Sequence, residues 1–208
     1  MRRGFTLLEA VLGVGLLALL SLAVFGLFRL GSDHFRIGVM RNDLQGQGRR
    51  AIALLQRELP RSSYPSVGVF NSGLNPPRDA ISFATLSDWN DPVLFDPAGG
   101  RPEWDRYYFF FCTTDLPRGR LGYAVVDPGG EAKTPWANMA TFTPVVAPPN
   151  VAGELTRVTV LADSVETFQV RDLSDQIAFD LVLSGQGLDV NRRQERYQFT
   201  FTLKPINP

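Results

Sequence analysis

The feature that most constrains this chain is an uninterrupted apolar run close to its N-terminus. From Ala10 to Phe28 there is no charged residue, and Ser21 is the only plainly polar side chain. A helix of this length spans about 28 Å, which is close to the thickness of the hydrocarbon core of a bilayer. The run is therefore predicted to be a membrane-spanning helix of about the minimum length.

Three other interpretations of the run fit less well. A cleaved secretory signal requires small residues at a cleavage site after the run, but Arg29 and Leu30 follow it. An ordinary signal anchor fits the run but does not explain Glu9, a carboxylate inside the apolar segment. A buried helix of a soluble protein would rarely run so far without a polar face. A carboxylate near a membrane centre costs a few kcal/mol and is by default functional and partnered.

A partner for Glu9 arises if the chain is cut after Gly4, because Phe5 then carries a free α-amine. The amine of one subunit and the Glu9 carboxylate of a neighbour would neutralise each other in a helix bundle of low dielectric constant. Glu9 is therefore a candidate assembly contact. Gly4 and Phe5 are candidate processing residues.

The segment Gly4-Phe5-Thr6-Leu7-Leu8-Glu9 follows a short basic leader and precedes the apolar run. In this context it closely resembles the processing motif of the type IV pilin and pseudopilin family. The resemblance implies that a prepilin peptidase cuts after Gly4 and methylates Phe5. It further implies other pilins or pseudopilins as partners through the N-terminal helix, together with an inner-membrane assembly platform that has a separate ATPase.

The resemblance also implies a location. The leader would be cytoplasmic, the helix would cross the bacterial inner membrane once, and the head would be periplasmic. The subunit would then enter an envelope filament, which can reach the outer membrane or the cell surface. Arginines flank the apolar run on both sides, so the positive-inside rule alone leaves the orientation open.

The helix is predicted to continue beyond the membrane as far as Pro60, which ends it. At 100° per residue, one face of this continuation is apolar or small. Its members are Ile37, Met40, Leu44, Gly48, Ala51, Ile52, Leu55 and Leu59. Arg49, Arg50, Gln56 and Arg57 lie on the other side. The glycines at 26, 31, 38, 46 and 48 indicate either a stalk that bends or melts locally, or close helix–helix contact.

Beyond Pro60 the apolar pattern changes to the period of two that is typical of strands. Predicted strands are 80–86, 106–112, 121–126, 155–161, 165–171, 177–183 and 197–203. The fold class is therefore α+β, a pilin-like long helix packed on an antiparallel β-sheet head. The predicted organisation is a leader (1–4), a transmembrane helix (5–30), an amphipathic exported helix (31–60) and a β-rich head (61–208).

Composition argues against an enzyme. The chain has one histidine, His34, and one cysteine, Cys112, which excludes most nucleophilic and metal-ligand constellations. Cys112 ends an aromatic run at 107–111 and is predicted to be a buried thiol in a core strand. No phosphate-binding loop is present, so no catalytic residue, cofactor or metal is expected.

Two weaker signals have plain alternatives. The acidic loop with Asp88, Asn90, Asp91 and Asp96 would suit calcium or a simple turn. Arg192, Arg193 and Arg196 would suit DNA phosphates or a solvated loop, and the zero formal charge of the chain gives no reason to expect nucleic acid.

Segments 49–59 and 160–170 loosely resemble W-type minor pilins and J-type pseudopilins. We therefore expect a minor subunit that helps initiate or cap a type IV pilus-like filament, in pilus assembly, twitching motility or DNA uptake during natural transformation. The alternatives are a J-type pseudopilin of type II secretion, which exports proteins, or a filament-borne head that binds DNA or a surface.

Overall fold

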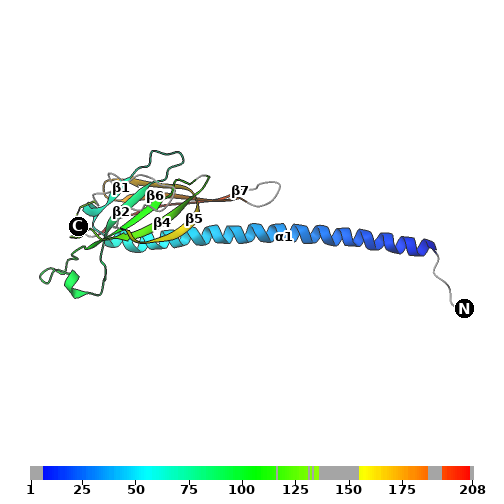
Figure 1. Cartoon of the computed structure of the whole chain (residues 1–208), viewed down its shortest axis with the longest axis horizontal. Helices are drawn as coiled ribbons and strands as arrows, with labels where there is room; N and C mark the ends of the chain where they lie inside the picture. Colours follow the sequence, from blue (N-terminus) through cyan, green and yellow to red (C-terminus); the bar gives the residue numbers. More distant parts are fainter. Residues whose placement is uncertain are drawn as a thin grey trace.

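A computed structural model of the chain describes residues 7–115, 117–130, 132, 134–135, 155–186 and 194–206. One long helix, α1 (Leu7–Glu58), leads into a β-rich head. Figure 1 shows the C-terminal part of α1 lying along the head, while the rest of the helix projects away from it. The helix ends where predicted, because Pro60 lies in the short 3-10 helix η1 (Leu59–Arg61) that follows α1.

The described strands form one sheet in the order β1 to β7, and every neighbouring pair is antiparallel. The strands are β1 (Gly68–Phe70), β2 (Ala80–Thr85), β3 (Arg106–Cys112), β4 (Gly119–Val126), β5 (Leu155–Asp172), β6 (Ile177–Gln186) and β7 (Gln194–Leu203). The α+β class is confirmed. The short edge strand β1 was not predicted, and the two segments predicted at 155–161 and 165–171 are one strand, β5.

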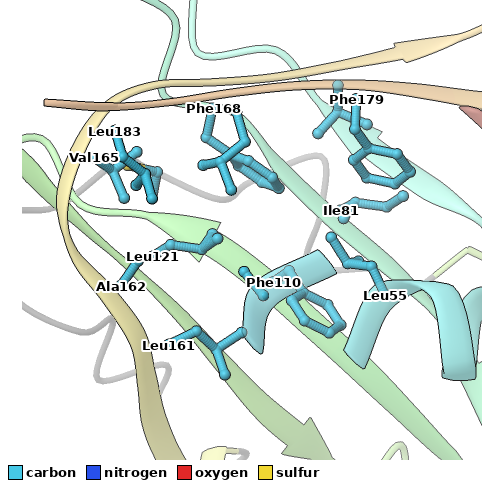
Figure 2. Packing of buried hydrophobic residues seen from close by; sticks show 14 of the residues in the cluster. Leu55, Ile81, Phe110, Leu121, Leu161, Ala162, Val165, Phe168, Phe179 and Leu183 are labelled. Atoms are coloured by element: carbon cyan, nitrogen blue, oxygen red, sulfur yellow. The ribbon is translucent and has the colours of Figure 1, made fainter. Parts of the chain in front are cut away.

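β5 is long because it bends and takes part in two portions of the sheet. Its first half pairs with β4 and its second half with β6, and the register shifts between Val165 and Thr167. Figure 2 shows β5 curling around one end of the core. On its other side, Phe168 makes an isolated parallel bridge to Arg78, just before β2, and its amide donates to the carbonyl of Pro77. The sheet is therefore curled, which gives it a concave side that can enclose a core.

α1 fills this concave side. Leu44, Ala51 and Leu55 are at most 2% exposed, and they pack against residues of β2 to β6. Figure 2 shows Leu55 near Ile81 and Phe110. The predicted apolar stripe is confirmed in this part of the helix. Burying each of these leucines removes enough apolar surface from water to contribute about 1.5–3 kcal/mol.

A second core lies on the opposite side of β3, and it was not predicted. Alternate residues of a strand face opposite sides of the sheet, so Phe110 belongs to the α1 side while Phe109 and Phe111 belong to the other. All three are at most 1% exposed. Trp104, from the segment between β2 and β3, is buried in this second core. The aromatic run is therefore core strand, as predicted, and it serves two cores.

The period-two apolar pattern of the predicted strands 177–183 and 197–203 implies one buried and one exposed face, and this has different outcomes in β6 and β7. In β7, Phe199 and Phe201 are half-buried while Gln198 and Thr200 are exposed, which confirms the alternation. In β6 the predicted strand is present, but the expected alternation of burial is wrong, because Ala178 is buried as well as Ile177, Phe179, Leu181 and Leu183. The reason is position, since β6 lies inside the sheet between β5 and β7.

The glycines of α1 do not interrupt it, because the helix is continuous from Leu7 to Glu58. Gly48 is a close approach of helix and sheet: a Cβ there would lie 2.3 Å from Cε2 of Phe199 on β7. At Gly26, Gly31, Gly38 and Gly46 a Cβ would meet nothing within 4 Å. In this chain by itself, only Gly48 among these five is needed for packing.

Candidate assembly surface

The N-terminal part of α1 offers a long apolar surface that the head does not cover. Every residue from Leu7 to Gly31 is exposed, and large apolar side chains such as Leu20, Phe25 and Phe28 are 67–76% exposed. At 1.5 Å per residue this part of the helix is about 37 Å long. By length and composition it suffices to cross a membrane, and a signal sequence would meet the same criterion.

Glu9 lies in the first turn of α1 and is exposed, as are Leu8 and Leu12. A carboxylate there interacts favourably with the N-terminal end of the helix dipole. Gly4 and Phe5 lie outside the described residues. The structure therefore places Glu9 on an uncovered apolar helix, and its contact with a neighbouring Phe5 amine stays a prediction.

The apolar surface continues past the predicted membrane segment. Phe35 is 73% exposed and Val39 is 53% exposed. At 100° per residue they lie within about 40° of Phe28 and roughly opposite Leu44, which faces the head. His34, which precedes Phe35, is also exposed. This segment of helix therefore presents one apolar side that the head leaves uncovered, which suits packing against another helix.

Helix packing on the head begins at Met40, which is half-buried against the core on the α1 side. A Cβ on Gly185 of β6 would lie 2.8 Å from the Met40 sulfur and 3.1 Å from Cδ1 of Leu44, so the helix approaches the sheet closely there. Further along, the buried side chain of Gln47 accepts a hydrogen bond from the backbone N–H of Asp163, at 3.1 Å. These contacts fix α1 to β5 and β6, and they set the direction in which the uncovered helix projects.

The acidic loop does not gather its carboxylates. Asp88 accepts from the N–H of Asn90, Asp91 from that of Val93, and Asp96 from that of Ala98. Each carboxylate therefore closes a local turn, which is the alternative that the sequence left open. Within the described part of the chain, no three acidic, histidine or cysteine side chains come together as a metal site.

The predicted basic cluster is described only at Arg196. Its guanidinium lies 3.1 Å from a carboxylate oxygen of Glu166 on β5, and its side chain is mostly exposed. Arg192 and Arg193 lie outside the described residues. The DNA-binding interpretation of this cluster stays a prediction.

Cys112 is a buried core thiol, as predicted, and is 1% exposed. Burial raises its pKa to about 11, although the neighbouring guanidinium of Arg78 opposes the shift. A thiol with so high a pKa is a poor nucleophile at neutral pH. It is therefore a packing residue.

Two buried charged residues, Arg78 and Asp79, hold the bend of β5, and neither was predicted as a structural contact from the sequence. The Arg78 guanidinium donates to the carbonyl of Val165, at 2.5 Å, where the register shifts. Asp79 accepts from the N–H of Val170, at 3.0 Å, and from the N–H of Ser72. Two charged residues directly before the mostly apolar strand β2 were a signal, but their partners on β5 are far away in sequence.

No protein-family model matches the chain, and comparison with curated proteins and with solved structures gives no significant match. The structure itself supports a coarser statement. A long N-terminal helix, apolar and uncovered near its start, packs at its other end on an antiparallel sheet. This arrangement is consistent with a pilin-like architecture.

Proposed function

We propose that the chain is a structural subunit of a type IV pilus-like filament: a minor pilin or pseudopilin that helps to initiate or cap it. The role is mechanical rather than enzymatic, and ATP hydrolysis belongs to a separate assembly motor. Its partners are other pilin-like subunits, which pack against the N-terminal helix first in the inner membrane and then in the filament.

The observation that carries this proposal is the uncovered apolar part of α1 together with Glu9. A soluble monomer rarely exposes so large an apolar surface, because water disfavours it. A lipid-facing anchor would account for the apolar residues but not for the carboxylate among them. A helix that leaves the lipid to pack with like helices accounts for both, since a cleaved neighbour supplies an amine to neutralise Glu9.

The proposal is tested by the N-terminus of the mature protein. Removal of residues 1–4 takes away two arginines, which leaves 19 basic against 21 acidic residues, a formal charge of −2. Mass spectrometry of protein extracted from membranes should identify Phe5 as an N-methylated first residue. The matched control is Gly4→Val, which should stay uncleaved because a bulky side chain prevents close approach of the protease to the backbone. Recovery of wild-type protein with Met1 intact would refute the assignment.

The finer choice between a pilus and a secretion pseudopilus depends on the partners. A pilus subunit is expected to cross-link to other minor pilins, and deleting it should reduce motility or DNA uptake. A J-type pseudopilin would instead cross-link to secretion pseudopilins, and deleting it should leave exported proteins in the periplasm. The minor-pilin assignment fails if only secretion is affected.

A further inference from the structure

The described sheet has two edge strands, and only one of them is short. β1 has three residues, whereas β7 has ten and pairs with β6 in one unbroken register from Gln194 to Leu203. In an antiparallel pair, every second residue of a strand directs its N–H and C=O away from the partner strand. In the part of the chain that the structure describes, the backbone from Tyr197 to Leu203 pairs with β6 and makes no other backbone hydrogen bond. The outer edge of β7 therefore presents a row of backbone donors and acceptors to which another strand can bind.

The apolar side chains of β7 are only partly covered. On the side of the sheet that faces α1, Phe201 and Phe199 of β7 lie opposite Phe179 and Leu181 of β6. The two β6 side chains are at most 1% exposed, whereas the two β7 side chains are half-buried. The difference follows from position, because β6 has a strand on each side and β7 has a strand on one side only. A further strand beside β7 would complete the burial of this apolar row.

β7 lacks the features that usually protect an exposed edge. Natural edge strands are shortened, bulged, or interrupted by proline or by charged residues. β7 contains no proline and no bulge, and its two charged residues, Glu195 and Arg196, lie near its start. The exposed side chains of Gln198 and Thr200 are hydrogen-bonded to Asp180 of β6, so they are held toward the sheet and not over the edge. A long apolar edge of this kind either aggregates or receives another strand.

β7 runs in the same direction as α1. At the start of the strand, Glu195 lies 2.9 Å from the guanidinium of Arg41, near the point where α1 reaches the head. Just beyond the end of the strand, the N–H of Ile206 donates to the carbonyl of Pro60, which follows α1, at 3.0 Å. The contacts therefore advance together along the strand and the helix, and the direction of β7 is tied to that of α1.

This direction argues against a second copy of the chain as the added strand. Antiparallel pairing of two β7 edges would point the two α1 helices in opposite directions, whereas N-terminal helices anchored in one membrane share one orientation. Parallel pairing of the same two edges would keep the helices aligned but turn one sheet over. The apolar row of each copy would then adjoin the polar row of the other, with Gln198 and Thr200, and would stay uncovered. The other edge strand, β1, has only three residues to offer.

We propose that the outer edge of β7 receives an extended segment of a different envelope protein, which adds one further strand to the sheet. The segment pairs antiparallel to β7, as all neighbouring strands of this sheet do. About seven residues, or about 24 Å, suffice to match Tyr197 to Leu203. Its backbone supplies the affinity, and apolar side chains at alternate positions on the α1 side supply the specificity. The inference rests on the proposed function, and it adds a partner that binds the head and not the N-terminal helix.

Hydrogen exchange of the full-length protein in detergent micelles tests whether the edge is open. In the wild type, amides from Tyr197 to Leu203 should be protected at alternate positions, because only those that point to β6 are bonded. A second chain carries a flexible Gly-Ser linker after Pro208 and then a copy of residues 177–184, the sequence that pairs antiparallel with β7 from its other side. In this filled-edge chain the remaining amides should also become protected. The matched control has proline at the third and fifth positions of the appended copy, which removes two backbone donors, and should keep the alternate pattern.

The same three chains test whether a partner uses the edge. In cells that lack the native gene, the wild-type chain and the proline control should restore the process that the deletion abolishes. The filled-edge chain should not restore it, because its own appended strand occupies the place of the partner. Two differently tagged copies that carry Thr200→Cys should give no disulfide between them under mild oxidation, and the buried native Cys112 does not compete.

The outcomes separate this inference from the proposed function. Continuous protection of residues 197–203 in the wild type, or no added protection in the filled-edge chain, would show that the edge does not accept a strand. Equal complementation by the two extended chains would show that no partner depends on the edge. A disulfide between two Thr200→Cys copies would overturn the assignment to a different protein. Each of these results in a chain whose Phe5 is methylated rejects the added strand and leaves the filament role standing, whereas an uncleaved wild-type N-terminus rejects the filament role itself.

Discussion

Two glycines one half-turn apart on α1 should respond in opposite ways to the same substitution. Gly46 is exposed, and a Cβ there would meet nothing within 4 Å. Gly48 is buried, and its Cβ would lie 2.3 Å from Cε2 and 2.6 Å from Cζ of the Phe199 ring. Gly46→Ala and Gly48→Ala therefore make the same gain in helix propensity and differ in what the new methyl group touches.

The magnitudes follow from these distances. Replacing glycine by alanine inside a helix stabilises it by about 1 kcal/mol. At Gly46 no steric clash opposes this gain, because a Cβ there meets nothing within 4 Å. At Gly48 the ring of Phe199 has to move by more than 1 Å to reach ordinary contact, and overpacking of this kind costs about 1–3 kcal/mol. The two variants should therefore differ in unfolding free energy by about 1–3 kcal/mol. For a chain of this size, each kcal/mol corresponds to roughly 2–4 °C in melting temperature.

The assay is urea unfolding of the full-length protein in detergent micelles, followed by tryptophan fluorescence. A third variant, Phe199→Leu, removes the ring edge that the new methyl group would meet. In that background Gly48→Ala should recover most of its helix gain, and a double-mutant cycle isolates the coupling. If Gly48→Ala stabilises the wild type as much as Gly46→Ala does, the ring yields freely, and the close approach does not fix the helix on the sheet.

Two further predictions concern Glu9 and Cys112. Glu9→Ala should leave cleavage and membrane insertion intact but reduce co-purification with partner pilins, because the Phe5 amine loses its counter-charge; Glu9→Asp is the matched control, and equal recovery from wild type and Glu9→Ala would contradict the assembly role. Iodoacetamide at pH 8 should label Cys112 only after unfolding. Because its pKa is raised from 9.0 to about 11 in the folded state, the folded chain holds the thiol proton more tightly. The free energy of unfolding should fall as the pH rises between these two values, which Cys112→Ala would prevent.

The sequence predicted those parts of the fold that depend on local pattern. The apolar residues of α1 recur at helical spacing, and Pro60 cannot donate the hydrogen bond that a continuing helix needs. In β7, Phe199 and Phe201 alternate with polar residues because one face of an edge strand is solvated. These patterns involve residues that are close together in the sequence, so they can be recognised without knowledge of long-range contacts.

The second core and the bend of β5 escaped prediction because both are long-range. An aromatic run such as 107–111 is equally compatible with one covered face or two, and only the packing of Trp104 decides that both are covered. Similarly, nothing near Arg78 in sequence reveals that its guanidinium binds the carbonyl of Val165. A buried charge has to be hydrogen-bonded, but the sequence does not say by which group.

The candidate assembly surface also has features that the sequence determined and features that only the tertiary structure decided. The sequence by itself determined that an apolar helix begins the chain and that Glu9 interrupts its apolar surface, because composition and spacing are local properties. Only the tertiary structure decided which side of α1 the head covers. That side is set by the packing of α1 on β5, β6 and β7, including the close contacts at Gly48 and Gly185.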